Sequence, residues 1–232
     1  MSSPYKTFSI KSFGCKVNLA DASMISKKLI QNGFSFVDFN DIADLYVINT
    51  CSVTNNADLK AEKFIKEVNL RAPQSKIIIT GCYAQLNPDR LLKNKGVDIV
   101  VGTEDKFKIE KYLYDLDESK KFISNINNVN DFQITHTTSE RTRSFIKIQD
   151  GCSYNCTYCT IPNARGKSRS ASIKKTIDKI NSIIELGMNE IVLSGINVGD
   201  FGDKKENFYM LLKEIEKIDS LKRYRISSIE PN

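Results

Sequence analysis

The sequence predicts an α/β protein, with a parallel α/β sheet domain followed by a shorter β-α-β-α-β unit. Two observations predict this fold class. From residue 7 onward, short apolar runs alternate with amphipathic stretches, which is typical of βαβ units. After a polar segment at residues 117–140, the same alternation begins again. The chain therefore contains two units built on parallel strands.

The first unit is expected to contain four strands with helical stretches between them. The apolar runs that predict strands are residues 7–13, 44–50, 76–81 and 97–102. The amphipathic stretches are residues 20–33, closed by Gly33; 56–72, stopped by Pro73; 87–94, with Pro88 in the first turn; and 104–116. We expect this domain to extend over residues 1–118.

A linker is expected at residues 119–140, because this segment is polar, rich in Asn and without sustained periodicity. It contains His136, the one histidine of the chain, which we expect to be solvated. The second domain is expected at residues 141–232. Its predicted strands are 143–149, 190–195 and 223–229, and its predicted helices are 172–187 and 207–218.

Three of the six cysteines follow directly after predicted strands of the first unit. Cys15, Cys51 and Cys82 come after the first, second and third of these strands. The carboxyl ends of parallel strands lie along one edge of a sheet, where ligands bind, so the three side chains can converge. A single buried cysteine at a strand end is usually a small apolar core residue. Three in the same topological position indicate a shared role.

The other three cysteines follow the strand at 143–149 and lie within a span of eight residues. They are Cys152, Cys156 and Cys159. A structural zinc site needs four ligands, and the fourth is missing here. A thioredoxin-like pair of Cys156 and Cys159 leaves Cys152 unexplained. A 4Fe-4S cluster held by three thiolates uses all three and leaves one iron open to an external ligand.

Composition and charge narrow the class of protein. The chain is 41% hydrophobic and 27% charged, has a net charge of +6, and shows neither a signal peptide nor a membrane-spanning stretch. We therefore expect a cytoplasmic protein with no membrane partner, whose cysteines serve metal binding or redox chemistry. Residues 141–175 contain eight basic side chains and one acid, Asp150. This patch suits a polyanion such as RNA, although a merely solvated basic face gives the same pattern.

These motifs resemble a known family. The spacing of Cys152, Cys156 and Cys159, with an aromatic residue before the last of them, is similar to that of radical S-adenosylmethionine enzymes. The stretches around the other cysteines resemble the motifs of the methylthiotransferases in that superfamily, most closely the tRNA N(6)-threonylcarbamoyladenosine methylthiotransferases. They read GCKVN (14–18), NTCSVTNNADLK (49–60) and TGCYAQLNP (80–88). The stretches CTIPNARGKSRS and RISSIEP are similar too.

The resemblance implies a fold and a set of cofactors. The second unit would be the first half of a radical-SAM partial (β/α) barrel, truncated after its third strand. Cys152, Cys156 and Cys159 would hold a 4Fe-4S cluster that generates a radical from S-adenosyl-L-methionine. Cys15, Cys51 and Cys82 would hold a second 4Fe-4S cluster, whose open iron carries the sulfur to be transferred.

The resemblance also implies substrate and cofactor contacts. Tyr158, Ser194 and Gly195 would contact S-adenosylmethionine, and Arg165, Lys167 and Arg169 would meet tRNA phosphates. The reaction would attach a methylthio group to carbon 2 of N(6)-threonylcarbamoyladenosine next to the anticodon, with an electron donor protein as partner. Because relatives carry a further β domain for RNA, we expect these 232 residues to be an N-terminal fragment that is inactive alone.

Three other functions fit the same residues. The first is an isopentenyladenosine tRNA methylthiotransferase, which differs in the motifs after the first two cysteines. The second is a non-catalytic iron–sulfur redox protein, which needs no S-adenosylmethionine. The third is a zinc-dependent RNA-binding module, which metal analysis after anaerobic purification would reveal.

Overall fold

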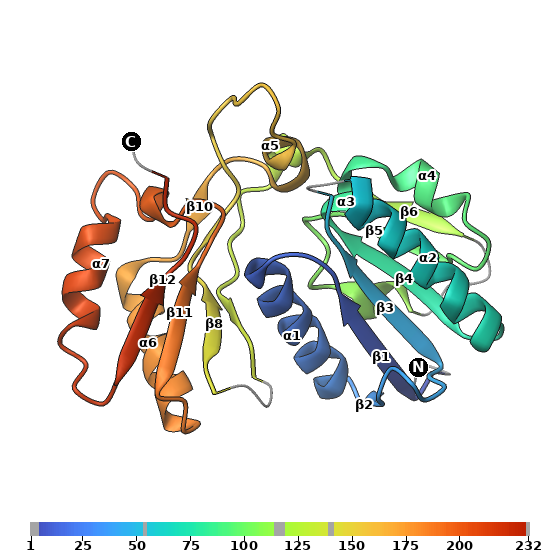
Figure 1. Ribbon diagram of the computed structural model, residues 1–232, viewed down its shortest axis with the longest axis horizontal. Helices are drawn as coiled ribbons and strands as arrows, with labels where there is room; N and C mark the ends of the chain where they lie inside the picture. Colours follow the sequence, from blue (N-terminus) through green and yellow to red (C-terminus); the bar gives the residue numbers. More distant parts are fainter. Residues whose placement is uncertain (1–4, 53–54, 114–118, 139–141, 231–232) are drawn as a thin grey trace.

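The computed structural model describes residues 5–52, 55–113, 119–138 and 142–230. Its first unit is a six-stranded, wholly parallel sheet with the strand order β2-β1-β3-β4-β5-β6 (Figure 1). The strands are β1 (Thr7–Ser12), β2 (Ser35–Phe36), β3 (Leu45–Thr50), β4 (Lys76–Gly81), β5 (Ile99–Val101) and β6 (Lys120–Phe122). The four strands expected in this unit are confirmed, and β2 and β6 extend the sheet at its two edges.

Helices cover both faces of this sheet. On one face lie α2 (Asn55–Arg71), α3 (Cys82–Leu86) and α4 (Pro88–Leu92). On the other face lie α1 (Lys16–Gln31) and the 3-10 turn η1 (Ile109–Tyr112). Each layer buries its own apolar cluster against the sheet, which is why the strands between them are almost continuously apolar.

The second unit is a four-stranded sheet with the order β12-β11-β8-β7. Its strands are β7 (Thr135–His136), β8 (Ser144–Lys147), β11 (Glu190–Ser194) and β12 (Arg223–Ile226), of which β7 alone is antiparallel. A short antiparallel pair, β9 (Gln149–Asp150) and β10 (Arg169–Ser170), follows β8. The helices are α5 (Ile161–Arg165), α6 (Ile173–Glu185) and α7 (Phe208–Ile215), with the 3-10 turn η3 (Val198–Asp200).

The structure confirms the second β-α-β-α-β unit, in which α6 and α7 bury an apolar cluster against β8 and β11. Helix α1 lies between the two sheets, so that one helix packs on both units (Figure 1). No helix among the described residues combines the length and the apolar character that crossing a bilayer requires.

The segment expected to be a linker contributes strands to both sheets. Its start forms β6 in the first sheet, its end forms β7 in the second, and the 3-10 turn η2 (Ile126–Asn128) lies between them. Strands this short leave no periodic pattern in the sequence. The prediction of a solvated His136 is wrong, because its side chain is only 6% exposed.

His136 makes stability depend on pH. Burial, reinforced by the charges of Lys179 and Lys27, lowers the pKa of His136 to about 4. The unfolded chain binds this proton near pH 6.5, so stability falls as the pH drops from 6.5 toward 4. At pH 5 the loss from this group is about 2 kcal/mol.

The measurement is urea denaturation of the protein and of a His136→Gln variant at pH 7.5 and pH 5. Other groups titrate equally in both proteins, so the difference between the two pH dependences isolates His136. Equal pH dependences in the two proteins would contradict the prediction.

Candidate functional site

The first group of cysteines lies at the carboxyl ends of three neighbouring strands. Cys15 follows β1, Cys51 follows β3, and Cys82 begins α3 directly after β4. Two glycines make this close approach possible. Gly14 has a φ of +105°, and a Cβ there would lie 2.5 Å from the Cβ of Cys51. Gly81 has a φ of +95°, and a Cβ there would lie 2.2 Å from the Thr50 carbonyl oxygen.

Arg165 contacts this group from the second unit, through Cys82. Its Nε donates a hydrogen bond to the Cys82 Sγ at 3.2 Å, and its Nη2 donates to the side-chain oxygen of Asn18. Burial acts to lower the pKa of Arg165, but the negative charges of Asp150, Cys82 and Cys15 outweigh it, so the pKa stays well above its usual value. The structure therefore places Cys15, Cys51 and Cys82 at one edge of the sheet, and their joint binding of a ligand stays a prediction.

The second group lies in the loop between β9 and α5. Cys156 is exposed, and Cys152 and Cys159 are partly exposed. The Cys159 N–H donates to the Cys156 carbonyl oxygen at 3.1 Å, which closes a turn between them. Burial raises the pKa of the Cys152 thiol, and the nearby Asp200, Cys159 and Cys156 raise it further.

Residues 165 and 166 contact both groups of cysteines. The side chain of Arg165 bonds Cys82, while the carbonyl oxygen of Gly166 accepts the Cys152 N–H at 3.0 Å. Arg165 Nη1 also donates to Asp150 at 2.7 Å, and Asp150 in turn accepts the N–H of Gly151. One dipeptide therefore positions a cysteine of each group.

A group of buried charges lies beside these contacts and joins the two units. Five side chains form it, each 5% exposed or less. They are Asp21, Lys106, Lys147, Asp150 and Arg165. Asp21, on α1, accepts from the Nζ atoms of Lys106 and Lys147, both at 2.6 Å. Burial acts to raise the pKa of Asp21, but these two positive charges outweigh it and lower the pKa.

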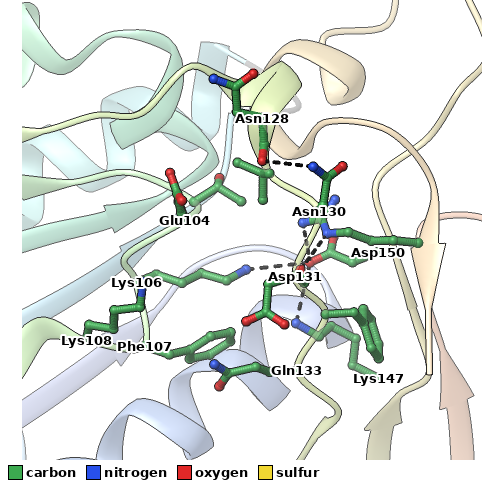
Figure 2. Close-up of a pocket in the computed structure, with 14 residues that line it drawn as sticks. Glu104, Lys106, Phe107, Lys108, Asn128, Asn130, Asp131, Gln133, Lys147 and Asp150 are labelled. Carbon is green, nitrogen blue, oxygen red and sulfur yellow. Dashed lines mark hydrogen bonds and ion pairs between the residues drawn. The ribbon is translucent and has the colours of Figure 1, made fainter. Parts of the chain in front are cut away.

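A cavity of about 240 Å³ opens onto this charged group from the side of the connecting segment (Figure 2). Figure 2 shows Lys106 and Lys147 approaching Asp150 from two directions. None of the six cysteines lines this cavity. A different cavity, of about 360 Å³, is bordered by Cys15 and Gly195.

The cysteines present fit thiolate-bound iron. All six lie in the described part of the chain, and none forms a disulfide. Among the five buried charges, three are positive and two negative, and the surplus cation, Arg165, faces the Sγ of Cys82. A thiolate-bound group at Cys82 would balance it. No three His, Cys, Asp or Glu side chains among the described residues are arranged to hold a metal ion, but a four-iron cluster is larger and takes more widely spaced thiolates.

The remaining predicted site residues differ in exposure. Tyr158 is 88% exposed beside Cys159, whereas Ser194 is fully buried and donates its hydroxyl to the Val192 carbonyl oxygen. Gly195 follows β11, where a Cβ would lie 2.7 Å from the Gln149 Oε1.

Of the three predicted phosphate contacts, only Lys167 is exposed. Arg165 is 2% exposed and paired with Asp150 and Asp21. Arg169 donates to the carbonyl oxygens of Arg165, Lys167 and Asp131 and lies 3.7 Å from Asp150. The basic patch expected from residues 141–175 is therefore partly internal, because Lys147 is buried as well.

Sequence reasoning missed the polar residues that organise the site. Asn18 and Asp21 lie on the buried face of α1 together with Ile25 and Leu29. A polar residue on the apolar face of an amphipathic helix is the sequence signal that could have indicated their role. Gln149 is fully buried, and its Oε1 accepts the N–H groups of Ile196 and Asn197. No pattern in the sequence marks Gln149.

Two family profiles match the chain, and each covers one unit. The uncharacterized protein family UPF0004 matches residues 7–102, and the Radical SAM superfamily matches residues 146–232. The chain also resembles solved structures of a radical S-adenosylmethionine methyltransferase, TsrM, from Kitasatospora setae. For one of them the TM-score is 0.57 at 12% identity, covering 84% of this chain and 50% of that one. At this identity the likeness concerns the fold.

Curated relatives match the chain over nearly its whole length. A "Threonylcarbamoyladenosine tRNA methylthiotransferase MtaB" of Bacillus subtilis is 38% identical over 97% of this chain and 51% of the relative. One of the same name from Aquifex aeolicus is 38% identical over 94% and 55%. A "tRNA-2-methylthio-N(6)-dimethylallyladenosine synthase" of Thermodesulfovibrio yellowstonii is 32% identical over 96% and 52%.

The second unit thus matches the Radical SAM superfamily, and the first unit matches UPF0004. Over nearly its whole length the chain is similar to methylthiotransferases, and among these relatives it is more similar to the two MtaB proteins. The chain spans about half the length of the curated relatives it matches.

Proposed function

We propose that the chain is part of a tRNA methylthiotransferase that attaches a methylthio group to carbon 2 of N(6)-threonylcarbamoyladenosine next to the anticodon. The observation that carries this proposal is the pairing of two three-cysteine groups across Arg165 and Gly166. The names of the Bacillus subtilis and Aquifex aeolicus relatives support the substrate. As these relatives are longer, we propose that the complete gene product is needed for activity.

Each cysteine group would hold one 4Fe-4S cluster. Cys152, Cys156 and Cys159 would hold the first, and Cys15, Cys51 and Cys82 the second. With S-adenosylmethionine and an electron donor protein, the first of these clusters would supply a carbon-centred radical that can activate a C–H bond.

The protein's own residues fix the geometry around these groups. Arg165 holds the Sγ of Cys82 and neutralises negative charge there. Gln149 fixes the backbone after Gly195, where the methionine part of S-adenosylmethionine would bind beside Ser194, while the exposed ring of Tyr158 would contact its adenine. Lys167 would meet tRNA phosphates, and Arg165 and Arg169 would support that loop from inside.

A second candidate substrate is the dimethylallyl-modified adenosine named for the Thermodesulfovibrio yellowstonii relative, which is 32% identical. A redox protein without transfer chemistry is the candidate from another class. It would bind iron but would not cleave S-adenosylmethionine to 5′-deoxyadenosine.

The test is mass spectrometry of tRNA nucleosides from cells that lack the gene and then regain it. We expect 2-methylthio-N(6)-threonylcarbamoyladenosine to disappear and return. Loss of only the methylthio form of dimethylallyladenosine would show that the second candidate is the substrate. An unchanged nucleoside profile would refute the transferase.

A further inference from the structure

The cavity beside Cys15 joins the two units. It has a volume of about 360 Å³ and lies between the start of α1 and the carboxyl ends of β11 and β12. Cys15 and Lys16 line it from the first unit, and Gly195, Ser227 and Ser228 line it from the second. This volume falls within the range of small-molecule sites. Under the proposed function, on which this inference rests, the cavity borders both cofactor positions and is the place for the reacting base.

Lys16 is the one charged side chain among the described residues that line this cavity. The other lining side chains are apolar or small, or carry a thiol or hydroxyl group. Lys16 is exposed, and within the described part of the chain its Nζ has neither an ion pair nor a hydrogen bond. The cation is therefore available to a ligand.

The start of α1 adds to the positive potential at this place. Lys16 is the first residue of this 16-residue helix, the N-cap Cys15 makes no capping side-chain hydrogen bond, and the first turn contains no acid. A helix N-terminus favours negative charge, and here it is combined with an unpaired ammonium group at the cavity. Such a site favours a ligand with an anionic group, of which a carboxylate is one.

The two candidate bases differ in this property. A threonylcarbamoyl group ends in the carboxylate of threonine, whereas a dimethylallyl group is an uncharged hydrocarbon. We propose that Lys16 binds the threonine carboxylate of the modified adenosine and thereby selects threonylcarbamoyladenosine over dimethylallyladenosine.

The experiment uses the complete gene product with its clusters and three anticodon stem-loop RNAs. The first RNA carries threonylcarbamoyladenosine, the second its analogue with the carboxylate changed to a carboxamide, and the third dimethylallyladenosine. Dissociation constants and methylthio product are measured for the wild type, Lys16→Gln and Lys16→Arg. Lys63→Gln, an exposed lysine on α2, is the matched control.

We expect the wild type to bind the carboxylate RNA about 10- to 100-fold more tightly than the carboxamide RNA. Lys16→Gln should abolish this ratio without weakening the carboxamide complex, Lys16→Arg should keep part of it, and Lys63→Gln should keep it fully. A wild type that prefers the carboxylate RNA, with the ratio unchanged in Lys16→Gln, would overturn the role of Lys16. Equal binding of the two RNAs by the wild type would also overturn it.

Failure of the proposed function gives a different result. An iron-loaded wild type that forms no methylthio product on any of the three RNAs would refute the transferase and, with it, this role of Lys16. Product on the first RNA with an unchanged Lys16→Gln ratio would refute only the role of Lys16.

Discussion

Replacing Asp21 with Asn should lower the free energy of unfolding by about 3–5 kcal/mol, because it leaves buried cations without their partner. Asp21 is 1% exposed and accepts from Lys106 and Lys147 at 2.6 Å each. In the variant, Asp150 alone would face these two lysines and Arg165. Because Asp21 lies on α1 and Lys147 on β8, the loss affects both units.

The measurement is urea denaturation of the wild type and the variant in the same metal state. The control is Asp89→Asn, which removes a surface ion pair with Lys121 whose side chains are 71% and 46% exposed. That change should cost less than about 1 kcal/mol. Similar small effects of the two substitutions would show that the buried group contributes little to stability.

Changing Cys15, Cys51 and Cys82 together to Ala should remove about half of the roughly eight irons that the two proposed clusters would bring to the complete protein. This variant should still cleave S-adenosylmethionine to 5′-deoxyadenosine, because Cys152, Cys156 and Cys159 remain. It should form no methylthio product, since the residues proposed to hold the transferred sulfur are gone. Iron assay and product analysis measure both effects.

The converse triple variant, at Cys152, Cys156 and Cys159, is the matched control. It should keep the other half of the iron and form no 5′-deoxyadenosine. If the N-terminal cysteines merely fill the core, the first variant keeps its full iron content and near-normal transfer. Methylthio product from that first variant would rule out the two-cluster mechanism.

The parts of the fold that could be predicted from the sequence are those with a local signal. The apolar runs at residues 44–50 and 76–81 agree with β3 and β4 within a residue, and they place Cys51 and Cys82 at strand ends. Helix α1 begins at Lys16, four residues before its predicted start. Asn18, in the first turn of this helix, is stabilised by donating to the Phe13 and Thr50 carbonyl oxygens.

What could not be predicted depends on contacts between distant parts of the chain. Arg165 looks like any basic residue of a solvated patch, and only the meeting of α5 with α3 turns it toward Cys82. Strands β6 and β7 have three and two residues, and their pairing with β5 and β8 decides their conformation. The assignment of iron to the six cysteines stays a prediction, as does the contact of S-adenosylmethionine with Tyr158, Ser194 and Gly195.

The contacts of Arg165 and Gly166 also connect the two groups of cysteines to each other. Cys152 is hydrogen-bonded to Gly166, and Cys82 is hydrogen-bonded to the neighbouring Arg165. A metal held by Cys152 and Cys159, as proposed, would order the segment that leads to residue 166, and this order would restrain the thiol of Cys82 in turn. Loading of one proposed centre would then prepare the other.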